Sequence, residues 1–359
     1  MDEQIFAIQA YGGISRVFAE LALEFSGNPA HGVDLASIDA PIVNRYVLDD
    51  PALAGALHVR AARSPWTALA RYFATPRIHP NCDILHNTFY LPHGLASTRG
   101  AKRIVTVHDM IPERLPRTRR RLDLLTLKRH YVQRADHIIC ISEATKADMI
   151  ECYGSLDCPV SVVHHGVDPR FRPGVARLPM LPSRYVLMVG HRGQYKDGQV
   201  LMRAFAEVAG SFPDLSLACI GGGELTRQER QVHAELGIEG RVMVAQLPDD
   251  LMPAAYANAA VFVFPSRFEG FGLPALEAMA SGVPCILADA TSLPEVGGDA
   301  VAYFPAGDEQ GLAQELHCLL ADPEAAARLA EAGLRRSAAF TWQACAERTA
   351  QAYRTALSN

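Results

Sequence analysis

The chain has 359 residues, of which 49% are hydrophobic and 20% are charged, with a formal net charge of −5. This length suits two α/β domains, and the composition excludes a disordered chain and argues against a nucleic-acid partner. No stretch reaches the ~20 apolar residues of a membrane span and no leader-like segment is found, so we expect a cytoplasmic protein.

Cysteine and histidine spacing bears on disulfides and metals. Eight cysteines are scattered without a Cys-x-x-Cys pair, which is typical of a reducing compartment. Adjacent His164 and His165 fall at a predicted strand end, where their side chains would point apart. We therefore expect no bound metal ion.

The first predicted elements are a strand over residues 5–9 and a helix. Gly12 and Gly13 lie between them, and apolar residues recur at helical spacing from Ile14 to Phe25. Such a glycine pair is compatible with a plain turn and with a loop that approaches a ligand. Residues 27–81 show mixed periodicity and predict no defined element.

Two further strands are predicted at 83–87 and 103–107. The second ends in His108 and Asp109. Ligands of open α/β sheets bind at the carboxyl ends of strands. This position makes His108 a candidate site residue, although such a histidine is more often structural.

Residues 114–130 form the most basic stretch of the chain. They hold one acidic residue, Asp123, and seven cations with interleaved leucines: Arg114, Arg117, Arg119, Arg120, Arg121, Lys128 and Arg129. One interpretation is a solvated helix face beside a core stripe. The other is a basic amphipathic helix resting on anionic lipid, where each cation contributes about 1 kcal/mol.

The first half closes with a strand at 137–141, a helix capped by Ser142 and a strand at 160–163. Four prolines then crowd between residues 169 and 182, which places the interdomain linker there.

The second half repeats the alternation of strands and helices, which predicts a parallel, doubly wound sheet. Arg192 and Lys196 follow the first of its strands. Exposed loop cations are common, yet two cations at the carboxyl end of a strand also suit a diphosphate. The five predicted strands cover residues 185–190, 212–220, 242–244, 261–264 and 286–288.

The most informative stretch runs from Pro265 to Cys285, between two buried strands. Gly270 and Gly272 leave its loop without side chains, so that backbone N–H groups can close on an anion. A helix follows, with a proline in its first turn. Glu269 precedes the glycines and Glu277 follows after seven intervening residues, so the two carboxylates face one ligand from two backbones.

This stretch, with Glu-Gly-Phe-Gly-Leu-Pro-x-Leu-Glu-Ala-Met-Ala-x-Gly-x-Pro, resembles the donor-site signature of the family 4 retaining glycosyltransferases of the GT-B fold. The resemblance extends over almost the whole chain and is weakest at 27–81. It implies two Rossmann-like domains facing a cleft: an acceptor domain at 1–170 and a donor domain at 171–341. The helix at 342–359 would return to the first domain.

The resemblance also implies roles for individual residues. Catalysis would depend on His108, Glu269, Lys196 and Arg192, where Glu269 orients the donor sugar and the two cations stabilise the departing diphosphate. Glu277 would bind the ribose, and His165 stands where the family usually has Asn. The remaining donor-binding residues would be Gly12, Gly13, Gly270, Phe271, Gly272 and Leu273.

The implied reaction transfers a sugar from a nucleotide diphosphate to an acceptor hydroxyl with retained configuration and needs no cofactor or metal. Residues 11–16 and 108–113 look most like bacterial surface-polysaccharide enzymes that use GDP-mannose. The partners would be the nucleotide sugar and a glycan or polyprenyl-linked oligosaccharide, with peripheral membrane contact through 114–130 at the inner face. The alternatives are a UDP- or dTDP-sugar donor, a GT-B-like epimerase and an inert nucleotide-sugar-binding subunit.

Overall fold

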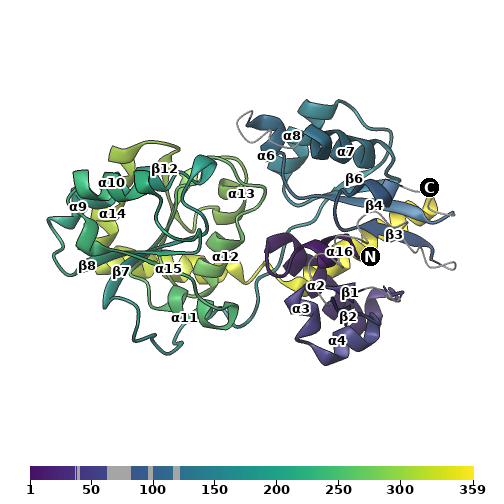
Figure 1. The fold of residues 1–359 in the computed structure, drawn as a ribbon, viewed down its shortest axis with the longest axis horizontal. Helices are drawn as coiled ribbons and strands as arrows, with labels where there is room; N and C mark the ends of the chain where they lie inside the picture. Colours follow the sequence, from purple (N-terminus) through teal and green to yellow (C-terminus); the bar gives the residue numbers. More distant parts are fainter. Residues whose placement is uncertain (37, 39–40, 63–81, 96–99, 116–121) are drawn as a thin grey trace. The chain divides into compact units, whose positions relative to one another are not determined.

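The computed structural model describes residues 1–36, 38, 41–62, 82–95, 100–115 and 122–359. Contacts among these residues divide the chain into two compact units, and each is described by itself. Unit 1 comprises Met1–Gly166 and Thr341–Asn359, and unit 2 comprises Val167–Phe340. Each is built on a parallel sheet with helices (Figure 1), which confirms the predicted fold class.

The main sheet of unit 1 has the order β3-β4-β5-β6, with all neighbouring strands parallel. Two very short parallel strands, β1 and β2, pair separately. The strands span Pro41–Ile42 (β1), Arg60–Ala61 (β2), Ile84–Asn87 (β3), Lys102–Val107 (β4), His137–Cys140 (β5) and Val160–Val162 (β6).

Helices cover both faces of this sheet. Successive residues of a strand point to opposite faces, so neighbouring apolar residues pack against different helices. Ile104 and Ile139 pack with α2 and α16, whereas Val105 and Ile138 pack with residues of α7 and α8. The helices of unit 1 span Gln4–Ile8 (α1), Gly13–Gly27 (α2), Arg45–Leu48 (α3), Pro51–Ala56 (α4), Ile111–Arg114 (α6), Leu122–Gln133 (α7), Glu143–Tyr153 (α8) and Trp342–Ser358 (α16).

The predicted strand at 5–9 is wrong, because Gln4–Ile8 forms the short helix α1. Side chains hold this segment in place of a strand ladder. The buried Asp2 carboxylate accepts hydrogen bonds from Asn87 Nδ2 at 2.6 Å and from the Thr88 N–H at 2.9 Å. The Ile5 N–H donates to Thr88 Oγ1 at 3.1 Å. These bonds fix the first residues at the end of β3.

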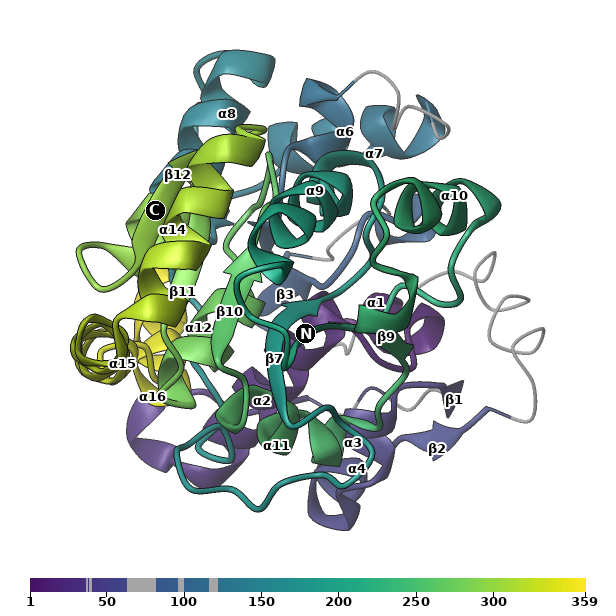
Figure 2. The same cartoon turned by 90° about the vertical axis from the view of Figure 1, so that its left-hand side faces the viewer.

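Unit 2 has a six-stranded parallel sheet in the order β12-β11-β10-β7-β8-β9 (Figure 2). All five predicted strands are present, and the sixth, β12, forms an edge that the sequence had not indicated. The strands span Arg184–Val189 (β7), Leu215–Ile220 (β8), Val242–Ala245 (β9), Val261–Phe264 (β10), Cys285–Asp289 (β11) and Ala302–Pro305 (β12). The helices span Gly198–Ala209 (α9), Arg227–Glu235 (α10), Met252–Ala257 (α11), Leu273–Ala280 (α12), Leu293–Gly297 (α13), Glu309–Ala321 (α14) and Pro323–Ser337 (α15).

The chain leaves unit 1 after Gly166 and returns to it at Thr341. The expected domain boundaries were 170 and 341. Helix α16, which follows the return, packs on α2 and supplies buried residues to the core of unit 1. Unit 1 is therefore built from two separate parts of the sequence.

Gly166 lies against the backbone of the returning segment. A Cβ atom there would come within 2.2 Å of the Trp342 nitrogen, a contact that no side-chain rotation relieves. We expect Gly166→Ala to lower the free energy of unfolding of unit 1 by about 2 kcal/mol. Urea unfolding followed by circular dichroism measures this change.

The matched control is Gly55→Ala in α4, where a Cβ would meet no atom within 4 Å. This substitution should raise stability slightly, by about 0.5 kcal/mol, since alanine is the better helix former. Equal stability of the two variants would contradict the close approach at Gly166.

Candidate active site

The loops that carry the predicted donor residues begin at neighbouring strands of unit 2. Strands β7 and β10 lie side by side at the centre of the sheet, although β8 and β9 separate them in the sequence (Figure 2). The strand order reverses between β7 and β10, and ligands of open α/β sheets bind at the carboxyl side of such a point. The loop with Lys196 follows β7 and the loop with Glu269 follows β10.

Lys196 and Glu269 meet in this region. Lys196 Nζ donates to Glu269 Oε1 at 2.6 Å, and their side chains are only 14% and 10% exposed. The ammonium group also lies 4.7 Å from the centre of the Phe264 ring. An ion pair this shielded from water keeps much of its electrostatic strength. The structure therefore brings together two of the predicted catalytic residues.

The backbone after Glu269 is shaped by glycine. Gly272 stands at the N-terminus of α12 with φ of 104°, a left-handed conformation that L side chains rarely adopt. A Cβ there would also come within 2.7 Å of Leu293. Pro274 lies in the first turn as predicted. The predicted residues Gly270 to Leu273 thus form a tight entry into the helix.

Two residues that the sequence analysis missed hold this loop. The Glu269 N–H donates to Thr291 Oγ1 at 2.9 Å, and Ser292 Oγ lies 3.0 Å from the carbonyl oxygens of both Glu269 and Phe271. Thr291 has φ of 48°, a left-handed conformation that costs a non-glycine residue about 1 kcal/mol or more. Both residues follow β11, so they reach this loop only through the folded sheet.

Glu277, the residue predicted to bind ribose, accepts a hydrogen bond from a tyrosine of unit 2. The hydroxyl of Tyr256, whose ring is fully buried, donates to Glu277 Oε2 at 2.8 Å. This bond fixes the orientation of the carboxylate on α12. Tyr256 was not among the predicted site residues, because twenty residues of chain separate the two.

Arg192 is buried and its guanidinium is occupied within unit 2. Its Nε donates to Glu229 at 2.7 Å, and its terminal nitrogens donate to the carbonyls of Gly221, Gly223 and Glu224 at 2.9–3.1 Å. These contacts join the loop after β7 to the glycine loop after β8. They favour a positioning role for Arg192 over direct contact with a diphosphate.

In unit 1, His108 follows β4 and is 7% exposed. Its ring centre lies 5.6 Å from that of Phe18 in an edge-to-face contact, and its Nε2 has no hydrogen-bond partner in the described structure. His108 lines a cavity of about 110 Å³ with Ile14, Phe89, Tyr90, Asp109, Pro112 and Lys128. A buried, unpaired ring nitrogen at a cavity can accept from or donate to a ligand oxygen.

The protonation state of His108 follows from its surroundings. The pKa of His108 is lowered to about 3, chiefly by burial and also by the nearby His86 and Lys128. The imidazole is therefore neutral at physiological pH. It can act as a hydrogen-bonding group but carries no positive charge.

Salt bridges with acidic residues hold the segment after His108. Lys128, which is 5% exposed, donates to the Asp109 carbonyl and, at 3.1 Å, to Glu113 Oε2. Arg114 pairs with Asp148 and Glu151 of α8. These two cations of the 114–130 stretch are thus neutralised within unit 1 and unavailable to a lipid surface. Arg129 is exposed, with its guanidinium carbon 6.0 Å from the centre of the Tyr153 ring. The remaining predicted contacts, Arg117, Arg119, Arg120 and Arg121, lie outside the described residues.

His165, at the position of the family's usual Asn, lies between two other rings. Its ring centre is 6.4 Å from that of His108 and 6.1 Å from that of Trp342. Burial lowers the pKa of His165 well below its ordinary value. The departure from the family pattern thus extends an aromatic cluster behind His108.

Of the predicted glycine pair, Gly12 is the N-cap residue of α2 and Gly13 is its first residue. Gln9 reaches across this pair, since Gln9 Oε1 accepts from the Ser15 N–H at 3.0 Å, and a Cβ on Gly12 would overlap the Gln9 amide. The Ser15 N–H, in the first turn of α2, is therefore already hydrogen-bonded within unit 1. The sequence did not indicate this role of Gln9.

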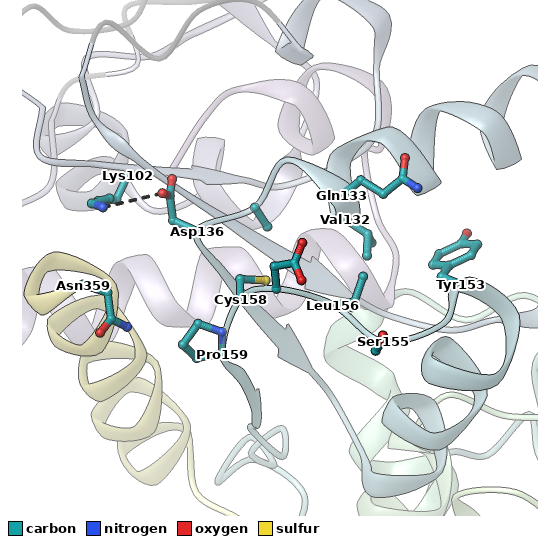
Figure 3. Close-up of a pocket in the computed structure, with 12 residues that line it drawn as sticks. Lys102, Val132, Gln133, Asp136, Tyr153, Ser155, Leu156, Cys158, Pro159 and Asn359 are labelled. Atoms are coloured by element: carbon teal, nitrogen blue, oxygen red, sulfur yellow. Dashed lines mark ion pairs between the residues drawn. The ribbon is translucent and has the colours of Figure 1, made fainter.

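A larger hollow of about 740 Å³ lies elsewhere in unit 1 (Figure 3). It is lined by residues that precede or begin β4, β5 and β6, including Lys102, Asp136 and Pro159. Lys102 and Asp136 form an ion pair there at 3.6 Å. This is the amino end of the strands, opposite to His108, and thus the end where ligands of such sheets are not expected.

Comparisons with known proteins cover both units. The family model described as Glycosyltransferase Family 4 matches residues 11–171, and that described as Glycosyl transferases group 1 matches residues 179–336. In the part of the chain that the structure describes, no helix is long and apolar enough to cross a membrane.

Individual relatives and solved structures are also glycosyltransferases or share the fold. The MMP alpha-(1->4)-mannosyltransferase of Mycolicibacterium hassiacum is 27% identical over 96% of this chain and 93% of its own length. The GDP-mannose-dependent alpha-(1-6)-phosphatidylinositol monomannoside mannosyltransferase of Mycolicibacterium smegmatis is 30% identical over 69% of both chains. HepE of Anabaena, solved in complex with UDP and glucose, has a similar fold, with a TM-score of 0.71 over 96% of both chains at 17% identity. The chain therefore belongs to the family 4 (group 1) glycosyltransferases.

Proposed function

We propose that this glycosyltransferase transfers mannose from GDP-mannose to a hydroxyl of a glycan or polyprenyl-linked oligosaccharide in polysaccharide biosynthesis. The main observation in support of the donor site is the shielded Lys196–Glu269 ion pair, which lies near the N-terminus of α12 with its N-cap residue Gly272. The choice of mannose is supported by the names of the two mannosyltransferase relatives. UDP and dTDP donors remain the competing proposals, and HepE was solved with UDP.

The proposed mechanism needs stabilisation of the leaving diphosphate. Lys196 supplies a fixed positive charge, and backbone N–H groups of the loop at 270–273 supply hydrogen bonds where negative charge develops. Glu269 orients the donor sugar and balances positive charge at its anomeric carbon. No metal is assigned to this step.

We propose a front-face reaction in which the departing phosphate takes the proton of the acceptor hydroxyl, so that configuration is retained. Lys196 Nζ donates to Glu269 Oε1 at 2.6 Å, so this carboxylate oxygen is already engaged, which favours an orienting role for Glu269 over a nucleophilic one. His108 keeps its predicted catalytic role as a neutral hydrogen-bonding group. A glycosyl group trapped covalently on Glu269 would contradict this mechanism.

Nucleotide binding provides the direct test of the donor. We expect GDP to raise the thermal unfolding temperature and UDP, dTDP and ADP to have little effect, all in the presence of EDTA. A nucleotide at 100 times its dissociation constant stabilises the folded state by about 2.7 kcal/mol. Differential scanning fluorimetry measures the shift.

Other outcomes separate the alternatives. A rise in unfolding temperature with UDP or dTDP alone would mean that the donor is a UDP- or dTDP-sugar. A rise with GDP that EDTA abolishes would show that nucleotide binding needs a metal. Conversion of GDP-mannose to another nucleotide sugar without any acceptor would favour an epimerase. Tight binding of the donor with no turnover on any glycan would favour an inert binding subunit.

A further inference from the structure

Tyr11 differs from the other aromatic side chains of the described structure. Tyr11 is 56% exposed, whereas the other exposed large hydrophobic residues of the described structure are not aromatic. Tyr11 directly precedes the glycine pair at the start of α2. An exposed aromatic ring beside a candidate active site offers an apolar face on which a ligand can pack.

The backbone around Tyr11 is held firmly. Asn44 Nδ2 donates to the carbonyls of Gln9 and Ala10 at 3.0 and 3.3 Å, and the Arg45 N–H donates to the Ala10 carbonyl at 2.9 Å. Asn44 is itself fully buried. The ring of Tyr11 is thus presented by an anchored loop, which reduces the entropy lost when a ligand binds.

Neighbouring side chains complete a surface suited to a sugar. The ring of Tyr46 meets that of Tyr11 edge to face, with centres 5.4 Å apart and an interplanar angle of 84°. Arg45 and Asp49 pair on α3 through Nε and Oδ2 at 3.2 Å, and both side chains are about half exposed. The face of an aromatic ring attracts the polarised C–H groups of a pyranose. Guanidinium and carboxylate groups can bind its hydroxyls.

The position of Tyr11 relative to His108 is limited by the chain. Ile14 lines the cavity of His108, and Phe18 on the same helix touches the His108 ring. Ile14 is three positions after Tyr11 in the sequence, so their Cα atoms lie at most about 11 Å apart. A glycan whose reactive hydroxyl occupies the His108 cavity can therefore reach Tyr11 with its next sugar residue.

We propose that Tyr11, backed by Tyr46 and flanked by Arg45 and Asp49, is a subsite for the acceptor glycan. It holds the sugar residue that follows the one accepting the transfer, by stacking on its apolar face. This inference rests on the proposed function, and it lies entirely within unit 1. It requires the ring of residue 11 and not its hydroxyl.

Saturation-transfer difference NMR tests the subsite directly. The probes are the methyl α-glycosides of mannose, glucose, galactose and N-acetylglucosamine, added one at a time to the full chain. At least one should bind the wild type, and Tyr11→Ala should weaken that binding about tenfold, equivalent to about 1.4 kcal/mol. Tyr11→Phe and Tyr11→Trp should bind as the wild type does, because both keep an aromatic face.

Leu23→Ala serves as the matched control, since Leu23 lies on α2, the helix that follows Tyr11, and is an apolar residue that is 38% exposed. It should leave glycoside binding unchanged. Absence of binding by all four glycosides, or equal binding by the wild type and Tyr11→Ala, would overturn the subsite.

Thermal shifts with GDP on the same samples keep the two proposals apart. Tyr11→Ala should retain the nucleotide shift of the wild type, because the donor residues lie in unit 2. A normal GDP shift with no glycoside binding would reject the subsite alone. Glycoside binding that depends on Tyr11 without any nucleotide shift would reject the donor proposal alone.

Discussion

Replacement of Lys196 by methionine is expected to lower kcat by a factor of about 10²–10³, because it removes the positive charge that stabilises the departing diphosphate. The same change leaves the shielded carboxylate of Glu269 unpaired, which should lower the free energy of unfolding by about 3 kcal/mol. A transfer assay and urea unfolding measure the two effects. The double variant Lys196→Met with Glu269→Gln should recover stability but not turnover.

Arg203→Gln is the matched control for this ion pair. Arg203 pairs with Glu309 in the same unit at 3.2 Å, but both side chains are nearly half exposed, so this pair contributes at most about 1 kcal/mol. Its loss should leave turnover unchanged. Turnover of Lys196→Met within twofold of the wild type would refute the role of Lys196.

His108→Phe is expected to lower kcat about a hundredfold, since it keeps an aromatic ring beside Phe18 and removes both ring nitrogens that could bind the sugar. The variant should retain the GDP shift, because the donor residues belong to unit 2. Initial rates with saturating donor measure the change. A His108→Phe enzyme with unchanged kcat would show that this histidine is structural.

The same variant should also change how the free energy of unfolding depends on pH. The pKa of His108 is lowered to about 3 in the folded state, so below pH 6.5 the unfolded chain binds a proton that the folded chain does not. This contribution to stability is present in full above pH 6.5. It is lost as the pH falls toward 3, by about 1.4 kcal/mol for each pH unit.

His108→Phe should therefore flatten the fall of stability between pH 6 and pH 4 relative to the wild type. His86 and His165, whose pKa values are also lowered by burial, leave part of the slope in place. Parallel curves for the two proteins would mean that His108 is protonated in the folded state.

Local signals predicted the donor motif well. Gly272, Pro274 and the apolar runs on either side act within a few residues, and the structure places β10, α12 and β11 where these signals indicated. Residues 4–8 show the limit of such signals, since the four-residue apolar run at 5–8 suits a strand or a buried helix turn equally. Hydrogen bonds from Asn87 and Thr88, more than eighty residues away, decide the outcome there.

The residues that support the site could not be predicted from the sequence, because their contacts too are with residues far away in the chain. The sequence assigns Arg192 to a diphosphate because its loop follows a strand, but in the structure its guanidinium donates hydrogen bonds to four residues between 221 and 229. Thr291 and Tyr256 support the two predicted glutamates from elements that only the folded sheet brings together. Residue types and spacing indicated the chemistry, whereas tertiary contacts distinguish the groups available to a ligand from those already bound.

The return of α16 to unit 1 has a consequence for synthesis on the ribosome. The core around Phe18 and Phe25 includes Trp342, Ala346 and Tyr353, which are translated after all of unit 2. Unit 2 is continuous in sequence and can complete its fold first, while one face of unit 1 stays uncovered until α16 has emerged from the ribosome. The apolar residues of unit 1 that α16 covers are therefore exposed to aggregation throughout the synthesis of unit 2.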